Sequence, residues 1–146
     1  MDEASTILLV EDNPDDAELL IYAFAKAGIS NPIMLLDDGE KAVNYVHGRA
    51  GYADRTEFPL PGLILLDLKL PRHSGFEVLE VIRSLEATRR TPVVVVTSSN
   101  QEHDIRRAYD LGANAYLVKP VGGDALTTMM SSIRAFWIQL NRAATS

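Results

Sequence analysis

Five polar side chains in this sequence stand directly after short apolar runs. They are Glu11, Asp12, Asp67, Thr97 and Lys119. The run before Asp67, Leu-Ile-Leu-Leu at 63–66, is entered through Pro-Gly and followed by Pro71, which is typical of a short strand buried on both faces. A carboxylate at the end of such a strand is costly unless something compensates its charge. The spacing therefore predicts that these residues compensate one another at one place in the fold.

Three neighbouring carboxylates would repel by several kcal/mol in a cleft of low effective dielectric constant. Such a cluster either keeps a proton or binds a hard cation, and a site with few carboxylates that retains water suits Mg²⁺. A carboxylate, Mg²⁺ and an ammonium group together indicate phosphoryl transfer with the carboxylate as nucleophile. Asp67 would attack phosphorus, Lys119 would neutralise charge, and Thr97 would donate a hydrogen bond. No general base is needed, because a carboxylate is already ionised at neutral pH.

The elements that must position these residues alternate regularly along the chain. Apolar runs predict five strands, at 6–10, 32–36, 63–66, 93–96 and 115–118. Helical spacing, caps and breakers predict five helices, which begin near residues 14, 39, 75, 102 and 124. This alternation favours an α/β fold with a doubly wound parallel sheet flanked by helices. In the strand order 2-1-3-4-5 the first and third strands are neighbours, so their acids would converge.

Composition restricts the class of protein. The 146 residues suit a single domain spanning 1–146, and 47% apolar residues describe an ordinary globular core. A net charge of −6 argues against nucleic acid and anionic membranes as partners. The sequence has no cysteine and no apolar run long enough to span a membrane, and its amino terminus lacks the positive region of a signal peptide. We therefore expect a cytoplasmic protein.

At these residues the sequence resembles the receiver domain of two-component response regulators. The resemblance covers about residues 5 to 140. The motifs that carry it are Ile-Leu-Leu-Val-Glu-Asp-Asn-Pro at 7–14, Leu-Leu-Asp-Leu-Lys-Leu-Pro at 65–71, Val-Val-Val-Thr-Ser at 94–98, and Gly-Ala-Asn-Ala-Tyr-Leu-Val-Lys-Pro at 112–120. The resemblance implies the flavodoxin-like receiver fold with strand order 2-1-3-4-5. It also implies a signalling protein rather than an enzyme.

The resemblance assigns roles to individual residues. Asp67 would be phosphorylated by a histidine kinase. Asp12, Asp67 and the backbone carbonyl of Lys69 would bind Mg²⁺, and Glu11 would act through a bound water.

Two further expectations follow from the same resemblance. Thr97 and Tyr116 would form a switch pair that rearranges on phosphorylation; the alternative for Tyr116 is an ordinary half-buried strand aromatic. The Lys119–Pro120 peptide bond would be cis, an uncommon isomer even before proline.

Two features resemble the single-domain regulators that pair with bacterial phytochrome kinases: the long, aperiodic segment before the third strand, read as an extended surface loop, and the ending Ile133–Leu140. Only one helix, at about 124–141, follows Lys119, so the signal would leave through the receiver surface itself. In that helix Leu126, Met130, Ile133 and Trp137 form a core stripe. The other apolar residues, Phe136, Ile138 and Leu140, then predict a homodimer through this region.

Blander interpretations remain open. Taken singly, an aspartate at a strand end is usually a turn residue, and the histidines at 47, 73 and 103 have no metal-ligand spacing and suit solvated loops. A flavodoxin-like cofactor binder would need a phosphate-cradling loop after the first strand, where the acids Glu11 and Asp12 instead stand. A receiver fold retained only as a phosphorylation-independent adaptor is the stronger rival. Labelling by acetyl phosphate, or binding of a beryllium fluoride mimic, would distinguish a phosphorylated receiver from such an adaptor.

Overall fold

The apolar runs form a five-stranded parallel sheet. In the computed structural model, which describes residues 1–142 and 144, the strands are β1 (Ile7–Val10), β2 (Ile33–Leu36), β3 (Leu63–Leu66), β4 (Val93–Thr97) and β5 (Ala115–Val118). Their order is β2-β1-β3-β4-β5, with every pair parallel, so the predicted doubly wound topology is confirmed.

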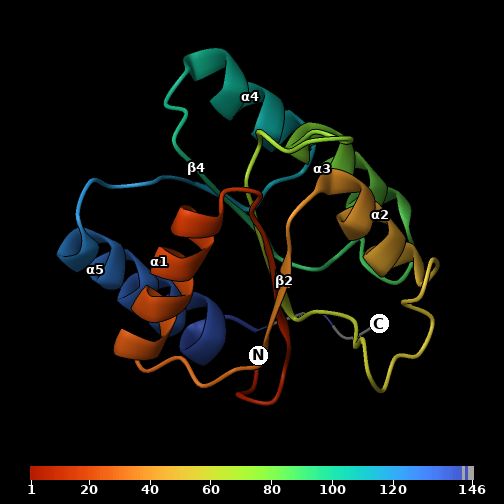
Figure 1. Cartoon of the computed structure of the whole chain (residues 1–146), viewed down its shortest axis with the longest axis horizontal. Coiled ribbons are helices and arrows are strands. Elements are labelled where there is room, and N and C mark those ends of the chain that lie inside the picture. Colours follow the sequence, from red (N-terminus) through yellow and green to blue (C-terminus); the bar gives the residue numbers. More distant parts are fainter. Residues whose placement is uncertain (143, 145–146) are drawn as a thin grey trace.

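Helices cover both faces of this sheet (Figure 1). The helices are α1 (Pro14–Lys26), α2 (Gly39–His47), α3 (Gly75–Ser84), α4 (Glu102–Asp110), α5 (Gly123–Ile133) and a terminal π-helix η1 (Arg134–Leu140). Helices α1 and α5 lie together on one face, whereas α2, α3 and α4 lie on the other. Within the described part of the chain, no helix has both the length and the apolar character needed to cross a bilayer.

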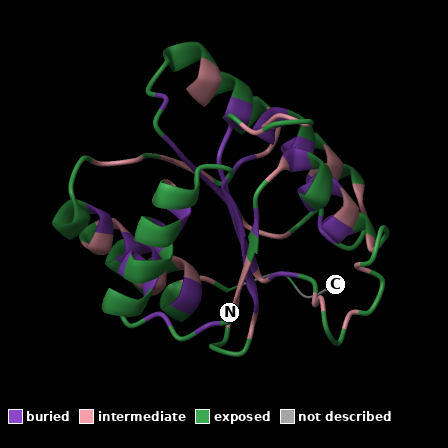
Figure 2. Ribbon diagram, viewed as in Figure 1, coloured by how far each residue is buried: buried purple, intermediate pink, exposed green. Residues whose placement is uncertain are grey.

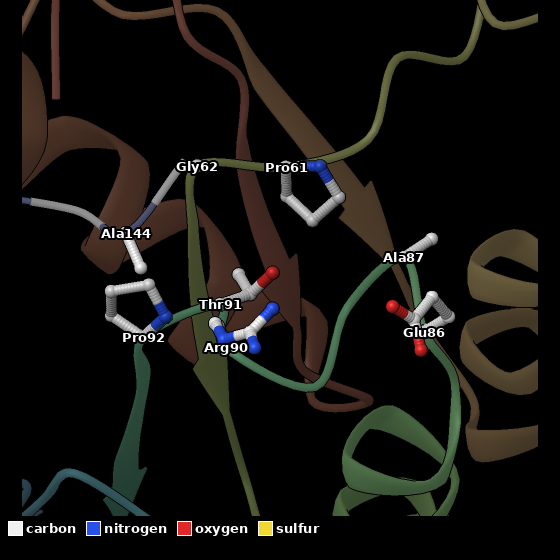
Figure 3. Close-up of a pocket in the computed structure, with 8 residues that line it drawn as sticks. All are labelled: Pro61, Gly62, Glu86, Ala87, Arg90, Thr91, Pro92 and Ala144. Atoms are coloured by element: carbon white, nitrogen blue, oxygen red, sulfur yellow. The ribbon is translucent and has the colours of Figure 1, made fainter. Parts of the chain in front are cut away.

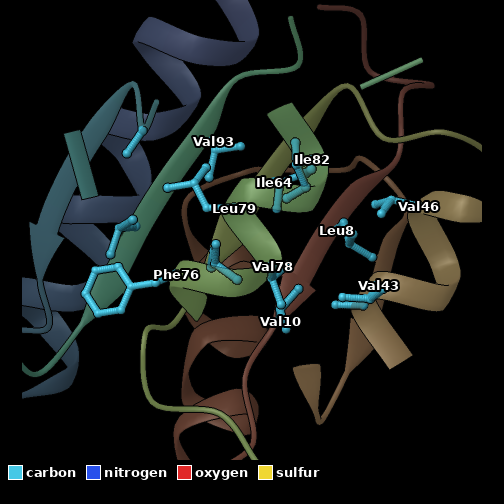
Figure 4. Close-up of a cluster of buried hydrophobic side chains, with 14 of the residues drawn as sticks. Leu8, Val10, Val43, Val46, Ile64, Phe76, Val78, Leu79, Ile82 and Val93 are labelled. Atoms are coloured by element: carbon cyan, nitrogen blue, oxygen red, sulfur yellow. The ribbon is translucent and has the colours of Figure 1, made fainter. Parts of the chain in front are cut away.

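Each central strand buries side chains on both faces, because successive residues point in opposite directions. Ile7 and Leu9 pack toward α1 and α5, whereas Leu8 and Val10 pack toward α2 and α3. Figure 4 shows the buried cluster that includes Leu8 and Val10. Figure 2 shows the buried strands between two helical layers whose outer faces are exposed. This double burial explains why the strands read as unbroken apolar runs.

The last helix differs from the prediction. A single α-helix to about residue 141 was expected, but the α-helix ends at Ile133 and continues as a π-helix, in which the Asn141 N–H donates to the Phe136 carbonyl five residues back. Because of the wider turn, the next buried residue after Ile133 comes five positions later rather than four. Ile138 is therefore buried, while Trp137, the predicted core residue, is only half-buried.

The segment between α2 and β3 is irregular, as predicted, but its side chains hold it to the core. Arg55 donates to the carbonyls of Tyr45 (2.9 Å) and Val46 (3.1 Å) in the last turn of α2. Tyr52 and Phe58 pack against the Tyr45 ring with centroids 5.1 and 6.1 Å away. The guanidinium thus caps carbonyls at the carboxyl end of α2, where the Tyr45 carbonyl also accepts from the Gly48 N–H, so the segment is anchored rather than extended into solvent.

Candidate functional site

Strand register brings the predicted acids together. Val10 pairs with Leu66 across β1 and β3, so the residues that follow them, Glu11 and Asp67, lie level at the carboxyl edge of the sheet. With Asp12 they form a cluster in which one carboxylate oxygen from each residue lies within 4.8 Å of the others. Glu11 and Asp67 are buried, and Asp12 is exposed at the rim. Convergence of the three acids is therefore confirmed as geometry.

Lys119 enters this cluster from the end of β5. Its ammonium group donates to Glu11 Oε1, to Asp67 Oδ2 at 3.1 Å and to Asp16 Oδ2 at 3.0 Å. The backbone N–H of Lys119 also donates to the Thr97 carbonyl at 2.7 Å, which fixes the start of the lysine beside β4. One cation thus faces three carboxylates in a partly desolvated site, where charge-assisted hydrogen bonds are strong.

Sequence reasoning missed Asp16 as a member of this site. Asn13 caps α1 by accepting from the backbone N–H groups of Asp15 and Asp16, which turns the first helical turn toward the end of β1. An acid there is usually explained by the helix dipole alone. The available signal was its place in the first turn of a helix that begins at the acidic strand end.

Burial and charge set the protonation of the cluster. Burial, assisted by the negative charge of Asp67, raises the pKa of the Glu11 carboxyl to about 7 against the opposing Lys119 hydrogen bond. Burial by itself would lower the pKa of Lys119, but hydrogen bonds to Glu11 and Asp16 and the charge of Asp67 raise it above its ordinary value. Lys119 therefore stays charged at any physiological pH, and Glu11 holds the proton that the cluster most readily releases.

The Asp67 carboxylate is oriented by its own loop. Its Oδ1 accepts from the Leu68 N–H at 2.7 Å and, at 3.4 Å, from the Lys69 N–H, while Oδ2 faces Lys119. Gly75 packs so closely on this loop that a Cβ atom there would lie 2.2 Å from the Asp67 carbonyl oxygen. Asp67 keeps 9% of its side-chain surface exposed, between the exposed residues Asp12 and Lys69. A donor can therefore approach it from the solvent edge.

Thr97 and Tyr116 form a second polar group, one strand further along. Thr97 is fully buried, and its hydroxyl lies 3.5 Å from the Ser99 N–H. Tyr116 is half-buried and donates from its hydroxyl to the Ser99 carbonyl at 2.9 Å. Burial raises the pKa of Tyr116 despite that hydrogen bond. The predicted pair is thus joined through Ser99.

The expected cis peptide is absent, since the Lys119–Pro120 bond is trans. The trans isomer is the intrinsically preferred one by about 0.5–1 kcal/mol. In this isomer the Lys119 side chain already reaches its three acceptors, so no cis bond is needed to place it.

The acid cluster fits a divalent cation. Three carboxylates from adjacent loops, one of them exposed, suit an ion such as Mg²⁺ that retains several waters. Within the described residues no other group of three or more potential ligands gathers this way. His73 lies beside Glu77 (2.8 Å) and His103 beside Asp104 (3.3 Å), both well exposed and outside the cluster.

A separate pocket lies at the opposite edge of the sheet (Figure 3). It is formed where β3 and β4 begin, and its lining residues are Pro61, Gly62, Glu86, Ala87, Arg90, Thr91, Pro92 and Ala144. Because the strands are parallel, their amino ends lie a full strand length from the acid cluster. This pocket therefore takes no part in the chemistry of that site.

Comparison with known proteins agrees with this geometry. Residues 7–131 match the family described as the response regulator receiver domain. The chain belongs to that family. Receiver domains of this kind are signalling proteins.

Two curated relatives are similar along most of their length. A probable methanogenesis regulatory protein of Methanothrix harundinacea, FilR2, is 41% identical over 94% of this chain and 86% of its own. The response regulator Rcp1 of Synechocystis is 37% identical over 91% of this receiver and 88% of its own chain.

Solved structures of response regulators superpose closely on this receiver. The phosphorylated cyanobacterial phytochrome response regulator RcpA has a TM-score of 0.89 and 35% identity, covering 97% of this receiver and 99% of its own chain. The Mn²⁺-bound form of Rcp1 has a TM-score of 0.86, with the same identity and coverage. This chain therefore shares its fold with two such regulators. The Rcp1 structure holds a divalent metal ion, and RcpA is phosphorylated.

Proposed function

We propose that this receiver accepts a phosphoryl group on Asp67, in a Mg²⁺-dependent reaction, from the phosphohistidine of a kinase. An Asp67 oxygen attacks phosphorus and forms a P–O bond while the P–N bond of the donor breaks. The donor imidazole leaves with the electron pair and takes up a proton. The observation that carries the proposal is the Lys119 ammonium, which lies between Asp67 and Glu11 beside a rim carboxylate.

Each residue of the site has a distinct task in this reaction. Asp12, Asp67 and the Lys69 carbonyl would hold Mg²⁺, with Glu11 acting through a water. Bound Mg²⁺ supplies positive charge to the phosphoryl oxygens. Lys119 neutralises a further oxygen, and the backbone N–H groups that contact Asp67 Oδ1 keep Oδ2 turned toward Lys119.

After transfer, Thr97 and Tyr116 would report the new charge. The Thr97 hydroxyl becomes a hydrogen-bond donor to the phosphoryl group, and its link to Tyr116 through Ser99 carries the change to the β4–α4 connection. Residues 1–146 would act as one receiver domain that signals through its own surface.

A histidine kinase of the phytochrome type is the donor that we propose. RcpA, which is described as a cyanobacterial phytochrome response regulator, covers 97% of this receiver, and the bacteriophytochrome response regulator RtBRR is 40% identical over the same share. Beside the site, α1 exposes Leu19 (53%) and Tyr22 (62%), flanked by the acids Asp15 and Glu18. An apolar surface with an acidic rim suits a partner helix that is apolar and basic.

The test is phosphorylation in vitro. With Mg²⁺ and acetyl phosphate, the wild type should gain one phosphoryl group by intact-mass measurement, and Asp67→Asn should gain none. A wild type that gains no phosphoryl group, and binds no beryllium fluoride, would instead be a phosphorylation-independent adaptor.

Phosphotransfer from candidate kinases tests the partner separately. A phytochrome kinase should label the wild type rapidly, and Leu19→Glu should slow this transfer without slowing labelling by acetyl phosphate. Transfer only from kinases without a phytochrome module would overturn the pairing and leave the acceptor function intact.

The final helical region is the proposed homodimer interface. Phe136 is 52% exposed and Leu140 is 72% exposed on η1. Trp137 packs edge-on against the Phe136 ring, with centroids 4.8 Å apart, so these aromatics form one apolar surface.

A further inference from the structure

A side-chain hydrogen bond closes the connection between β4 and α4. Ser99, which is buried, donates from its hydroxyl to Asp104 Oδ2 at 2.6 Å. The same hydroxyl accepts from the Gln101 N–H at 3.3 Å. Asp104 lies in the first turn of α4 with only 19% of its side chain exposed, and His103 approaches its other oxygen at 3.3 Å. A bond this short between a hydroxyl and a carboxylate belongs to the stronger, charge-assisted class.

The backbone of Ser99 meets both members of the proposed switch. Its carbonyl accepts from the Tyr116 hydroxyl at 2.9 Å, and its N–H lies 3.5 Å from the Thr97 hydroxyl. We call the state in which the Tyr116–Ser99 and Ser99–Asp104 hydrogen bonds are both formed the closed connection. In it one residue links the end of β4, the ring on β5 and the first turn of α4.

Little else fastens this end of α4. Its N-cap residue, Gln101, makes no side-chain capping hydrogen bond, and Ala108 is the only buried residue of the helix. Elements with few buried contacts open at low free-energy cost. The Ser99–Asp104 bond is therefore placed to decide how often the connection is closed.

We propose that Ser99 and Asp104 are positioning residues that hold the connection closed before any phosphoryl group arrives, and so favour phosphorylation of Asp67. The proposal rests on the acceptor function proposed above and names a regulation of that site. A ligand that binds only to the closed connection has an apparent affinity proportional to the fraction of molecules in which the connection is closed. Loss of one charge-assisted hydrogen bond changes such a population about tenfold.

The experiment compares Asp104→Ala with two matched variants. Asp104→Asn retains an oxygen that can accept the Ser99 hydroxyl but lacks the charge, so it should restore part of the wild-type behaviour. Glu102→Ala removes another acid from the same first turn, where Glu102 is exposed, and so controls for the helix dipole. Beryllium fluoride affinity is measured at saturating Mg²⁺, and Mg²⁺ affinity is measured alone. NMR of ring-labelled tyrosine, assigned with Tyr116→Phe, reports the Tyr116 environment in the free protein.

Asp104→Ala should weaken beryllium fluoride binding about five- to tenfold and shift the Tyr116 ring signal, with Mg²⁺ affinity unchanged. Both effects should be absent in Glu102→Ala and smaller in Asp104→Asn than in Asp104→Ala. If Asp104→Ala left both the Tyr116 ring signal and the beryllium fluoride affinity unchanged, the proposal would be overturned. Equal losses of beryllium fluoride affinity in Asp104→Ala and Glu102→Ala would overturn it as well. If the wild type bound no beryllium fluoride at all, the acceptor function itself would fall. The ring signal would then still show whether Asp104 closes the connection.

Discussion

Lys119 shows how a single residue sets the chemistry of the site. Its ammonium contacts Glu11, Asp16 and Asp67, so removing it would leave three carboxylates to repel one another in a partly buried place. Glu11 is the most buried of the three, with 1% of its side chain exposed, and its pKa rises accordingly. Glu11, the residue closest to the lysine, therefore loses its proton near neutral pH rather than in the acid range.

This proton predicts a pH dependence of stability in the metal-free protein. The folded-state pKa of Glu11 is raised from 4.5 to about 7, so the folded protein binds the proton more tightly than the unfolded chain. The resulting stabilisation is complete below about pH 4.5 and is lost as the pH rises to about 7. Urea unfolding in EDTA should show the wild type losing about 1–3 kcal/mol of unfolding free energy relative to Glu11→Gln across this range.

Glu11→Gln cancels the titration at this position, so other acids contribute equally to both proteins. A difference between them that stayed constant with pH would contradict the raised pKa. Mg²⁺ should stabilise the wild type increasingly above pH 7, because metal binding favours the ionised carboxyl.

At the scale of elements, parallel register does most of the positioning. The strands run parallel in one register, so residues far apart in sequence meet at one edge, and the long Lys119 side chain reaches past β4 to Asp67 and Glu11. Asp67, Glu11 and the start of Lys119 are placed by backbone pairing alone. The loops then need only to orient carboxylates, which the close packing of Gly75 against the Asp67 carbonyl achieves.

The π-helical ending predicts an unusual pattern of substitution costs. Ile138→Ala should lower the free energy of unfolding by about 2–4 kcal/mol, because it empties a buried site. Leu140→Ala, at an exposed site two residues on, should change it by less than about 0.5 kcal/mol. Denaturant unfolding measures both. If Trp137→Ala lowered the free energy of unfolding more than Ile138→Ala does, the α-helix would instead continue without the wider turn.

The sequence predicted what depends on local pattern. Uninterrupted apolar runs located all five strands, and their polar ends located Glu11, Asp67 and Lys119, because register in a parallel sheet follows from strand position. It did not predict the π-helix, since α-helical spacing and π spacing differ by one residue and only tertiary packing chooses between them. The contacts of Asp16 and Arg55 were also invisible, because each depends on where a neighbouring element ends in space.

In the whole receiver, the acid cluster and the apolar surface of η1 lie at opposite ends of the sheet. The acids occupy the carboxyl edge of the sheet, while α5 and η1 run back toward the amino edge, where the Met1 amino group contacts the Ile138 carbonyl at 3.4 Å. The aromatic surface of η1 is therefore remote from Asp67. A partner bound there would leave the site open to a kinase, so the proposed dimerisation and phosphorylation can occur together.

The wild type should therefore form a dimer whose population rises with concentration in sedimentation velocity. Phe136→Ala combined with Trp137→Ala should shift it to monomer, because the double variant removes most of the apolar surface available to a partner. Leu140→Asp, a single change at a 72% exposed site, gives the same test with little risk to folding. Leu19→Ala removes an apolar side chain from α1 that is about as exposed as Phe136 (53% against 52%), and it should leave the dimer unchanged. Retention of the dimer in both η1 variants, or its loss in Leu19→Ala alone, would move the interface away from the final helical region.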